Sequence, residues 1–275
     1  MTAGQAARRV RAIPAVAEWA PSWTPTNPGA PLAFRPAPGW LPAGQRVYAI
    51  GDVHGCAAAL AALLAAVRDD LAARPTGRAE LVLLGDYIDF GPDSAGVLAC
   101  LSRPAPVPGA VVVALRGDHE QMLLDALAGE APAATDWLAA GGAASLASWG
   151  IPRHAPRTMW QALLPPTQLA FLRELRLSHR IGGYLFVHAG LRPGVKLARQ
   201  RRDDVLGIRQ PFLSEPAEFG AVVVHGHSVI AAPAIEAGRI GLDTGAGLGG
   251  ALSCAVLEDD RIACITVATD RGALP

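Results

Sequence analysis

Nine carboxylate and imidazole side chains follow short apolar runs in this sequence, in five separate segments. They are Asp52, His54, Asp86, Asp89, Asp118, His119, His188, His225 and His227. Glycine borders each segment and permits a turn sharp enough to aim the side chains into one cleft. This set of oxygen and imidazole donors contains no thiolate, suits divalent manganese, iron or zinc, and exceeds what one tetrahedral site uses. The sequence therefore predicts a pair of metal ions, an arrangement that activates water for phosphoryl hydrolysis.

Alternating strands and helices are predicted to position these side chains. β-Branched apolar runs at 46–51, 80–85 and 110–115 each end in a polar cluster, and a helical stretch follows each of them. This repetition predicts parallel crossovers, and in open α/β sheets the ligand site lies beyond the carboxyl ends of the strands. Further strands are expected at 184–188, 221–225, 239–243, 251–257 and 261–268. The last three follow one another through glycine- or aspartate-rich turns, which predicts an antiparallel sheet.

Three regions are distinguished along the chain. Residues 1–44 are rich in proline and contain three tryptophans, so we expect a partly disordered arm of which a part packs back on the domain. Residues 45–270 form the predicted metal-binding domain. Within it, residues 121–178 are mainly helical, carry no recognisable motif, and are predicted to form a helical insertion.

The composition narrows the classes of partner. The chain has 275 residues, of which 51% are hydrophobic, so it can bury a sizeable core. Lys+Arg 24 balances Asp+Glu 24, and we therefore expect neither nucleic acid nor an anionic membrane as the main partner. The longest alanine- and leucine-rich run is too short to cross a bilayer, which favours a cytoplasmic location. The four cysteines share no CxxC spacing and are interpreted as buried free thiols.

The polar clusters resemble the motifs of a known superfamily. Five segments look like the ordered motifs of metallophosphoesterases: Asp52-Val-His-Gly55, Gly85-Asp-Tyr-Ile-Asp89, Arg116-Gly-Asp-His-Glu120, Val187-His-Ala-Gly190 and His225-Gly-His227. They most resemble the phosphoprotein phosphatase branch, which includes bacterial serine/threonine phosphatases and symmetrical diadenosine tetraphosphatases. The resemblance implies the calcineurin-like metallophosphoesterase fold, an α/β four-layer α-β-β-α sandwich of two mixed sheets.

The resemblance also implies roles for individual residues. Two divalent ions, manganese first and iron or zinc as alternatives, would be held by Asp52, His54, Asp86, Asp118, His188 and His227, with Asp86 as the bridge. A metal-bridging hydroxide would attack in line, His119 would protonate the leaving group as general acid, and Asp89 would orient His119. Arg116 and Arg209 match arginines that hold phosphate oxygens, although a surface position is an equal alternative for Arg209. His225 is expected to support the ligands or the fold.

Two residues depart from the family pattern. Where the family has Asp-Arg-Gly, this chain has Asp89-Phe90-Gly91, so an aromatic ring replaces an arginine that grips the substrate phosphate. Phe90 is expected either to stack on a nucleobase or aryl leaving group, or only to pack against its neighbours. Asp118 replaces the usual asparagine and adds a negative charge, which would lower the Lewis acidity of bound metal.

Three hypotheses about function follow. The first is a metal-dependent phosphoserine and phosphothreonine protein phosphatase that hydrolyses phosphate monoesters. The second is an enzyme of the same fold that hydrolyses symmetrical dinucleoside polyphosphates or other nucleotides. The third is a weakly active metal-binding relative that acts by protein interaction, which Phe90 and Asp118 favour and the intact pair of His119 and Asp89 opposes. The substrate is accordingly expected to be a phosphorylated protein or a small phosphorylated molecule, and the sequence leaves the oligomeric state open.

Overall fold

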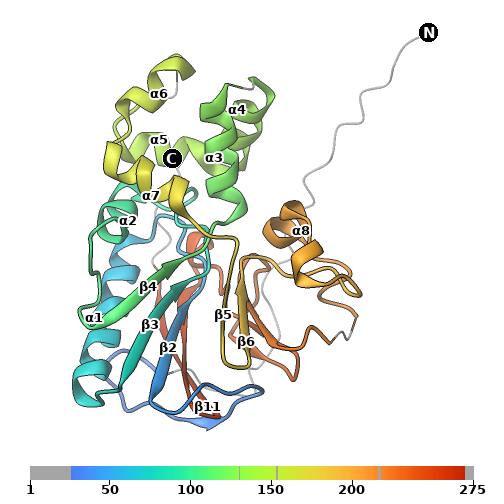
Figure 1. Cartoon of the computed structure of the whole chain (residues 1–275). Helices are drawn as coiled ribbons and strands as arrows, with labels where there is room; N and C mark the ends of the chain where they lie inside the picture. Colours follow the sequence, from blue (N-terminus) through green and yellow to red (C-terminus); the bar gives the residue numbers. More distant parts are fainter. Residues whose placement is uncertain (1–25, 130, 153, 216–217, 270–275) are drawn as a thin grey trace.

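The structure is a computed structural model that describes residues 26–129, 131–152, 154–215 and 218–269 (Figure 1). Trp19 and Trp23, and with them the first part of the arm expected at 1–44, lie outside these ranges.

Two mixed sheets form the centre of the described chain. One contains β1 (Arg35–Pro36), β2 (Gln45–Ile50), β3 (Arg78–Leu83), β4 (Ala110–Ala114), β10 (Ala251–Glu258) and β11 (Arg261–Ala268), in the order β1-β11-β10-β2-β3-β4. The other contains β5 (Ser178–Ile181), β6 (Tyr184–Val187), β7 (Val222–His225), β8 (Ala234–Ile235) and β9 (Arg239–Gly241), in the order β5-β6-β7-β9-β8. Each sheet has three adjacent parallel strands, β2-β3-β4 in the first and β6-β7-β9 in the second. Polar loops follow the carboxyl ends of these strands.

Helices cover the sheets and one end of the molecule (Figure 1). They are α1 (Ala57–Ala73), α2 (Ser94–Leu101), α3 (Asp118–Ala128), α4 (Ala131–Trp137), the π-helical turn η1 (Leu138–Gly142), α5 (Ala143–Ser148), α6 (Arg157–Leu163), α7 (Pro166–Glu174), η2 (Leu197–Arg199), α8 (Arg202–Gly207) and η3 (Ala246–Leu248). The helices α3 to α7 gather beyond the ends of the strands, and α8 lies beside the second sheet (Figure 1). No helix among the described residues is long and apolar enough to cross a membrane.

Alternate residues of the strands face opposite layers. In β2, Val47 and Ala49 pack between the two sheets, whereas Tyr48 and Ile50 pack in the cluster that α1 covers. The strand β6 alternates in the same way between the core shared by the sheets and the cluster that α8 covers. Because a strand has a side-chain period of two, this pattern buries both faces of each sheet. The four-layer α/β sandwich of two mixed sheets predicted from the sequence is confirmed.

The sheet predicted for the last three strands is wrong in one respect. The strands β10 and β11 pair antiparallel as expected, but β9 pairs parallel with β7 in the other sheet. The turn at 244–250 carries the chain from one sheet to the other, with Gly245 and Gly249 in left-handed conformations. Glycine permits this crossing as readily as a hairpin, so the turn sequence alone does not distinguish the two paths.

The second part of the expected arm lies on the domain. Thr26 exchanges backbone hydrogen bonds with β11, and β1 pairs antiparallel with the same strand. The carbonyl of Trp40 accepts a 2.8 Å bond from the amide of Gly183, while the Trp40 side chain is 57% exposed. Residues 26–44 therefore extend the edge of the six-stranded sheet and reach the turn between β5 and β6.

The cysteines are only partly as expected. All four are free thiols, and Cys254 and Cys264 are buried in the strands β10 and β11. Cys56 and Cys100 are half-buried, so the prediction of burial is wrong for these two. Cys56 precedes α1 and Cys100 lies in the last turn of α2, where solvent reaches one side of the chain.

Candidate metal centre and active site

The loops after the parallel strands of both sheets meet at one edge. The amide of His54 donates to the carbonyl of Asp86 at 2.8 Å, and the amide of Gly226 donates to the carbonyl of His188 at 2.7 Å. Of the six non-glycine residues with positive φ in the described chain, five lie in these loops: His54, Asp86, Asp89, Phe90 and His227. A left-handed backbone costs ~1–3 kcal/mol at a non-glycine residue, so the surrounding structure must hold it.

Two glycines let the loops approach their neighbours. A Cβ atom at Gly117 would lie 2.0 Å from Oδ1 of Asp86, and one at Gly226 would lie 1.9 Å from Oδ1 of Asp52. A side chain at either position would displace the carboxylate or the loop. Glycine at 117 and 226 thus sets the spacing of the donors.

Asp86 lies at the centre of the cluster. Its Oδ2 atom is 3.5 Å from Nε2 of His54, and its Oδ1 atom is 3.5 Å from Nε2 of His188. The two oxygens of one carboxylate therefore face histidines from different sheets. This is the placement that a ligand bridging two metal ions requires.

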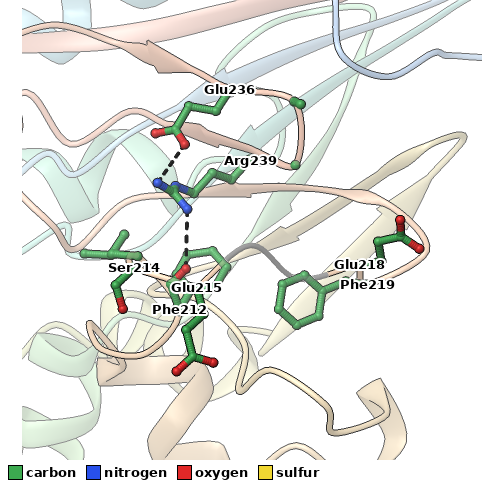
Figure 2. A pocket seen from close by; sticks show the side chains of 10 residues that line it. Phe212, Ser214, Glu215, Glu218, Phe219, Glu236 and Arg239 are labelled. Carbon is green, nitrogen blue, oxygen red and sulfur yellow. Dashed lines mark hydrogen bonds and ion pairs between the residues drawn. The ribbon is translucent and has the colours of Figure 1, made fainter.

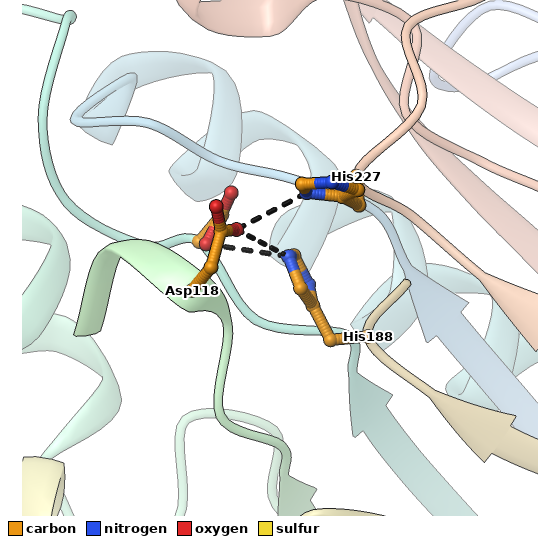
Figure 3. Close-up of side chains that lie close together, drawn as sticks. Asp118, His188 and His227 are labelled. Atoms are coloured by element: carbon orange, nitrogen blue, oxygen red, sulfur yellow. Dashed lines mark hydrogen bonds and ion pairs between the residues drawn. The ribbon is translucent and has the colours of Figure 1, made fainter. Parts of the chain in front are cut away.

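A second group of donors surrounds Asp118. Its Oδ1 atom is 3.0 Å from Nε2 of His188 and 3.1 Å from Nδ1 of His227 (Figure 3). The possible ligand atoms of Asp86, Asp118, His188 and His227 all lie within 4.8 Å of one another, as do those of His54, Asp86 and His119. The two groups share Asp86, so the cluster has room for a pair of ions.

Backbone contacts fix the orientation of two histidine rings. Nδ1 of His54 donates to the carbonyl of Ile88 at 2.9 Å, and Nδ1 of His188 donates to the carbonyl of Leu84 at 2.9 Å. A carbonyl can only accept, so the hydrogen sits on Nδ1 and the lone pair of neutral imidazole sits on Nε2. In both rings Nε2 faces the carboxylates, as expected for a histidine that binds a metal.

Two of the predicted ligands each have a buried polar atom without a hydrogen-bond partner in the described part of the chain. These atoms are Oδ1 of Asp52 and Nε2 of His227. The other carboxylate oxygen of Asp52 accepts from the amide of His227 at 2.9 Å, although Asp52 belongs to neither of the two groups of ligand atoms. Buried polar atoms without partners are costly, and a cation would satisfy them. The donor set, its burial and these two atoms fit divalent metal.

The charges of the cluster also fit a cation. Burial, followed by the charge of Asp243, raises the pKa of Asp52 well above its ordinary range. Burial and the charges of Asp118 and Asp52 do the same to the pKa of Asp86. Burial opposes protonation of His188, but the hydrogen bond to Asp118 and the charges of Asp52 and Asp118 together outweigh it and raise the pKa of His188 to about 9. The carboxylates thus repel one another without metal, and positive charge between them would relieve the repulsion.

His119 and Asp89 form a hydrogen-bonded pair beside the cluster. Nδ1 of His119 lies 2.7 Å from Oδ2 of Asp89, and both side chains are buried. Burial opposes protonation of His119, but the hydrogen bond to Asp89 and nearby charges outweigh it and raise the pKa of His119. The amide of His119 donates to Asp86 at 3.2 Å, so the pair is attached to the carboxylate at the centre of the cluster. A protonated imidazole here could donate to a leaving group.

Glu120, which follows His119 in the third motif, links two loops of the site. Its buried carboxylate accepts from the amides of Asp86 at 2.9 Å, Tyr87 at 2.7 Å and Gly117 at 2.9 Å. It therefore ties the loop after β3 to the loop after β4. The acidic residue one position after His119 was a signal, but only the fold shows which amides it reaches.

Two residues of the helical insertion were also missed. Trp137 and Ser145 are fully buried, and both donate hydrogen bonds to the carboxylate of Asp89. The alanine- and glycine-rich sequence around them carries no chemical pattern, so only the tertiary structure could identify them. The insertion predicted at 121–178 includes most of α3 and continues to β5, and it contacts the site directly.

The predicted arginines lie in different surroundings. Arg116 donates to Oε1 of Gln121 at 3.0 Å and to the carbonyl of Arg173 at 3.2 Å, while its buried Nε has no partner among the described residues. Arg209 approaches the carbonyl of His227 at 3.5 Å, so it lies beside a loop of the cluster.

Phe90 packs against two histidines of the site. Its ring centroid lies 5.0 Å from that of His54 and 5.2 Å from that of His119, with edge-to-face geometry in both cases. A Cβ atom at Gly141 would lie 3.0 Å from the Phe90 ring, so the insertion closes the other side. Local packing, one of the two alternatives for Phe90, is present. The ring is half-buried, which leaves part of it available to a ligand.

His225 belongs to neither group of ligand atoms. Its ring packs edge-on against Phe212 at 5.0 Å, and burial lowers its pKa to about 4. His225 thus ends β7 and packs against Phe212, apart from the two groups of ligand atoms.

A separate hollow of ≈ 640 Å³ contains none of the predicted site residues (Figure 2). It is lined by Phe212, Leu213, Ser214, Glu215, Glu218, Phe219, Glu236, Ala237, Gly238 and Arg239. Arg239 pairs with Glu236 at 2.7 Å, and the remaining charges are acidic. A phosphate would be repelled there, so we assign the chemistry to the metal cluster.

Comparison with known proteins agrees with the fold and the cluster. The calcineurin-like phosphoesterase family matches residues 45–246. The chain belongs to this family of metallophosphoesterases, whose members use divalent metals and hydrolyse phosphoesters.

Individual relatives differ in their activity. Serine/threonine-protein phosphatase 1 of Salmonella typhimurium is 41% identical over 98 residues, which is 36% of this chain and 39% of the relative. A symmetrical bis(5'-nucleosyl)-tetraphosphatase of Aromatoleum aromaticum is 34% identical over 151 residues, which is 54% of this chain and 45% of the relative. The matched segments thus span less than half the length of these curated relatives. The crystal structure of a putative diadenosine tetraphosphatase is similar with a TM-score of 0.60 and 27% identity, covering 83% of this chain and 96% of that chain.

Proposed function

We propose that this metallophosphoesterase holds two divalent ions and cleaves a phosphorus–oxygen bond with His119 as the proton donor. The observation that carries the proposal is the pair of ligand groups that share Asp86, with His119 beside the shared carboxylate. The proposed ligands are Asp52, His54, Asp86, Asp118, His188 and His227. Manganese is the proposed metal, with iron or zinc as alternatives, because the donors are carboxylates and imidazoles.

Each residue of the proposed site has a separate role in the reaction. Bound divalent ions would supply Lewis acidity and an activated water. His119 would donate its proton to the leaving oxygen, and Asp89 would hold the His119 ring through Nδ1 so that Nε2 remains for the substrate. Arg116 and Arg209 would bind the non-bridging oxygens of the phosphate, since their guanidinium groups stay charged.

We propose a dinucleoside polyphosphate as the substrate class. The likeness to the diadenosine tetraphosphatase structure extends over most of both chains, and several symmetrical tetraphosphatases match 54% of this chain. Phe90 agrees with this choice, because an internal phosphate of an anhydride carries less charge than a monoester and relies less on a guanidinium beyond those of Arg116 and Arg209. The half-buried Phe90 ring could also contact a nucleobase.

Hydrolysis of phosphoserine or phosphothreonine in proteins is the second candidate. It is the first of the three hypotheses drawn from the sequence, and the 41% identity to the Salmonella phosphatase supports it over 98 residues. The raised pKa of His119 is a further argument, because a serine or threonine alkoxide is a basic leaving group that benefits from a strong proton donor.

Product release by the manganese-loaded protein tests the proposal. The substrates are diadenosine tetraphosphate, a phosphothreonine peptide and an aryl phosphomonoester, and His119→Ala is the control. We expect diadenosine tetraphosphate to be cleaved fastest and turnover to fall at least tenfold in the control. Preference for the peptide would establish the second candidate. Equal, background-level release by both proteins, with metal bound, would refute the enzyme and leave a metal-binding protein that acts by interaction.

A further inference from the structure

We propose that Trp137 and Ser145 of the helical insertion are positioning residues that orient Asp89 and, through it, the proton donor His119. The inference rests on the proposed function, in which His119 protonates the leaving group. It gives the insertion a part in catalysis, although neither residue reaches the metal ligands.

The carboxylate of Asp89 accepts hydrogen bonds from His119 and from two donors of the insertion. Oδ2 accepts from Nδ1 of His119 at 2.7 Å and from Nε1 of Trp137 at 2.8 Å. Oδ1 accepts from the hydroxyl of Ser145 at 2.6 Å. The same hydroxyl oxygen accepts from the amide of Asp89 at 2.8 Å, so Ser145 holds both the side chain and the backbone of that residue.

These contacts are needed because Asp89 is held in an unfavourable conformation. Its φ is 74°, in the left-handed region that a non-glycine residue seldom adopts. Its side chain is 0% exposed, so water cannot replace a lost donor. With each carboxylate oxygen fixed by the insertion, the carboxylate cannot rotate, and the ring of His119 keeps Nδ1 toward Asp89 and Nε2 toward the site.

A purely structural role for the insertion is the alternative explanation. Trp137 packs edge-to-face on Trp160 with a centroid separation of 5.5 Å, so a change there also removes packing. The two explanations differ in what happens when His119 is absent. A residue that acts through His119 has nothing left to orient, whereas a residue that supports the fold is still required.

Matched variants separate the two explanations. Ser145→Ala removes the hydroxyl that binds Asp89. Its control is Ser148→Ala, which removes a hydroxyl one turn along α5. That hydroxyl donates to a carbonyl of α5 and accepts from the amide of Ala95 in α2. Trp137→Phe removes the indole N–H and keeps an aromatic ring. Its control is Trp149→Phe, since the indole of Trp149 donates to Gln168 at 2.7 Å and not to Asp89. Circular dichroism and melting temperature establish that each variant is folded, and calorimetry with manganese establishes that metal binding is retained.

The assay compares kcat and KM for phenyl phosphate and 4-nitrophenyl phosphate. We expect kcat for phenyl phosphate to fall about tenfold in Ser145→Ala and in Trp137→Phe, the size of effect typical of a charge-assisted hydrogen bond. Because 4-nitrophenolate leaves without much help from a proton donor, its kcat should fall much less. KM should stay unchanged, and the two controls should stay within about twofold of the parent.

The decisive step repeats Ser145→Ala and Trp137→Phe in the His119→Ala background. The inference predicts no further loss of kcat there, because the variants act through the missing ring. It is overturned by a further tenfold loss in that background, by equal losses on the two substrates, or by equal losses in the two controls. If His119→Ala itself leaves kcat unchanged, the proposed function fails first, which is a result distinct from these three.

Discussion

Asp86→Asn should stabilise the protein when metal is absent and greatly reduce the stability that the protein gains from metal. The pKa of Asp86 is raised well above 3.8 by burial and by the charges of Asp118 and Asp52, so the ionised form is unfavourable in the folded chain. The ligand atoms of Asp86 and Asp118 lie within 4.8 Å of each other, and two unit charges at that distance repel by ~3 kcal/mol at an effective dielectric constant of about 20. Positive charge on His188 offsets part of this repulsion.

We therefore expect the free energy of unfolding to rise by ~1–3 kcal/mol in metal-free Asp86→Asn at neutral pH. In a chain of this size ~1 kcal/mol corresponds to about 2–4 °C in melting temperature. The sign of the pH dependence follows from the raised pKa. The folded parent binds the proton of Asp86 more tightly than the unfolded chain, so its metal-free stability falls as the pH rises above about 4. The advantage of the variant should accordingly vanish in acid.

Thermal unfolding in chelator and in excess manganese measures both effects. The parent should gain ~3 kcal/mol when manganese is at about 100 times its dissociation constant, whereas Asp86→Asn should gain far less. Asp93→Asn is the control, because Asp93 is exposed and caps α2 through the amide of Gly96, a task that asparagine performs equally well. A metal-free variant that melts below the parent, or one that gains as much from manganese, would refute the placement of Asp86 at the centre of the cluster.

Two further substitutions test the neighbours of the cluster. Phe90→Arg should raise kcat/KM for simple phosphomonoesters about tenfold, because a guanidinium replaces the ring beside the site; kinetics no faster than those of Phe90→Leu would contradict this. Glu120→Gln should lower the free energy of unfolding by ~2–3 kcal/mol and weaken manganese binding, because an amide group then faces backbone N–H donors. Thermal unfolding and calorimetry would show this, with the exposed Glu174→Gln as the unaffected control.

The fold could be predicted because its signals are local. The period of two in β2 and in β6 divides each strand between two layers, and the helical stretches between strands require parallel crossovers. The sheet that β9 joins could not be predicted in the same way. The pairing of β9 with β7 depends on backbone hydrogen bonds to a strand more than a dozen residues earlier, and the glycine turn that follows permits either sheet.

The candidate ligands could be predicted for a related reason. The carboxyl ends of parallel strands lie on the same edge of a sheet, so polar residues that follow such strands converge whatever the lengths of the helices between them. Asp86 and His188 come from different sheets and still meet, because the loops of both sheets close over the same edge. The types of residue and their order along the chain therefore sufficed to indicate a metal cluster.

The sequence by itself indicated the candidate metal ligands and, through the family resemblance, the pairing of His119 with Asp89. Only the tertiary structure decided what holds that pair, since Trp137 and Ser145 lie about fifty residues from Asp89 in a stretch without a chemical pattern. The physical reason for this difference is that the backbone at the end of a strand fixes where the side chains that directly follow it point. A hydrogen bond from a distant helix depends instead on how the helices α4 and α5 pack, and that packing is a property of the whole fold.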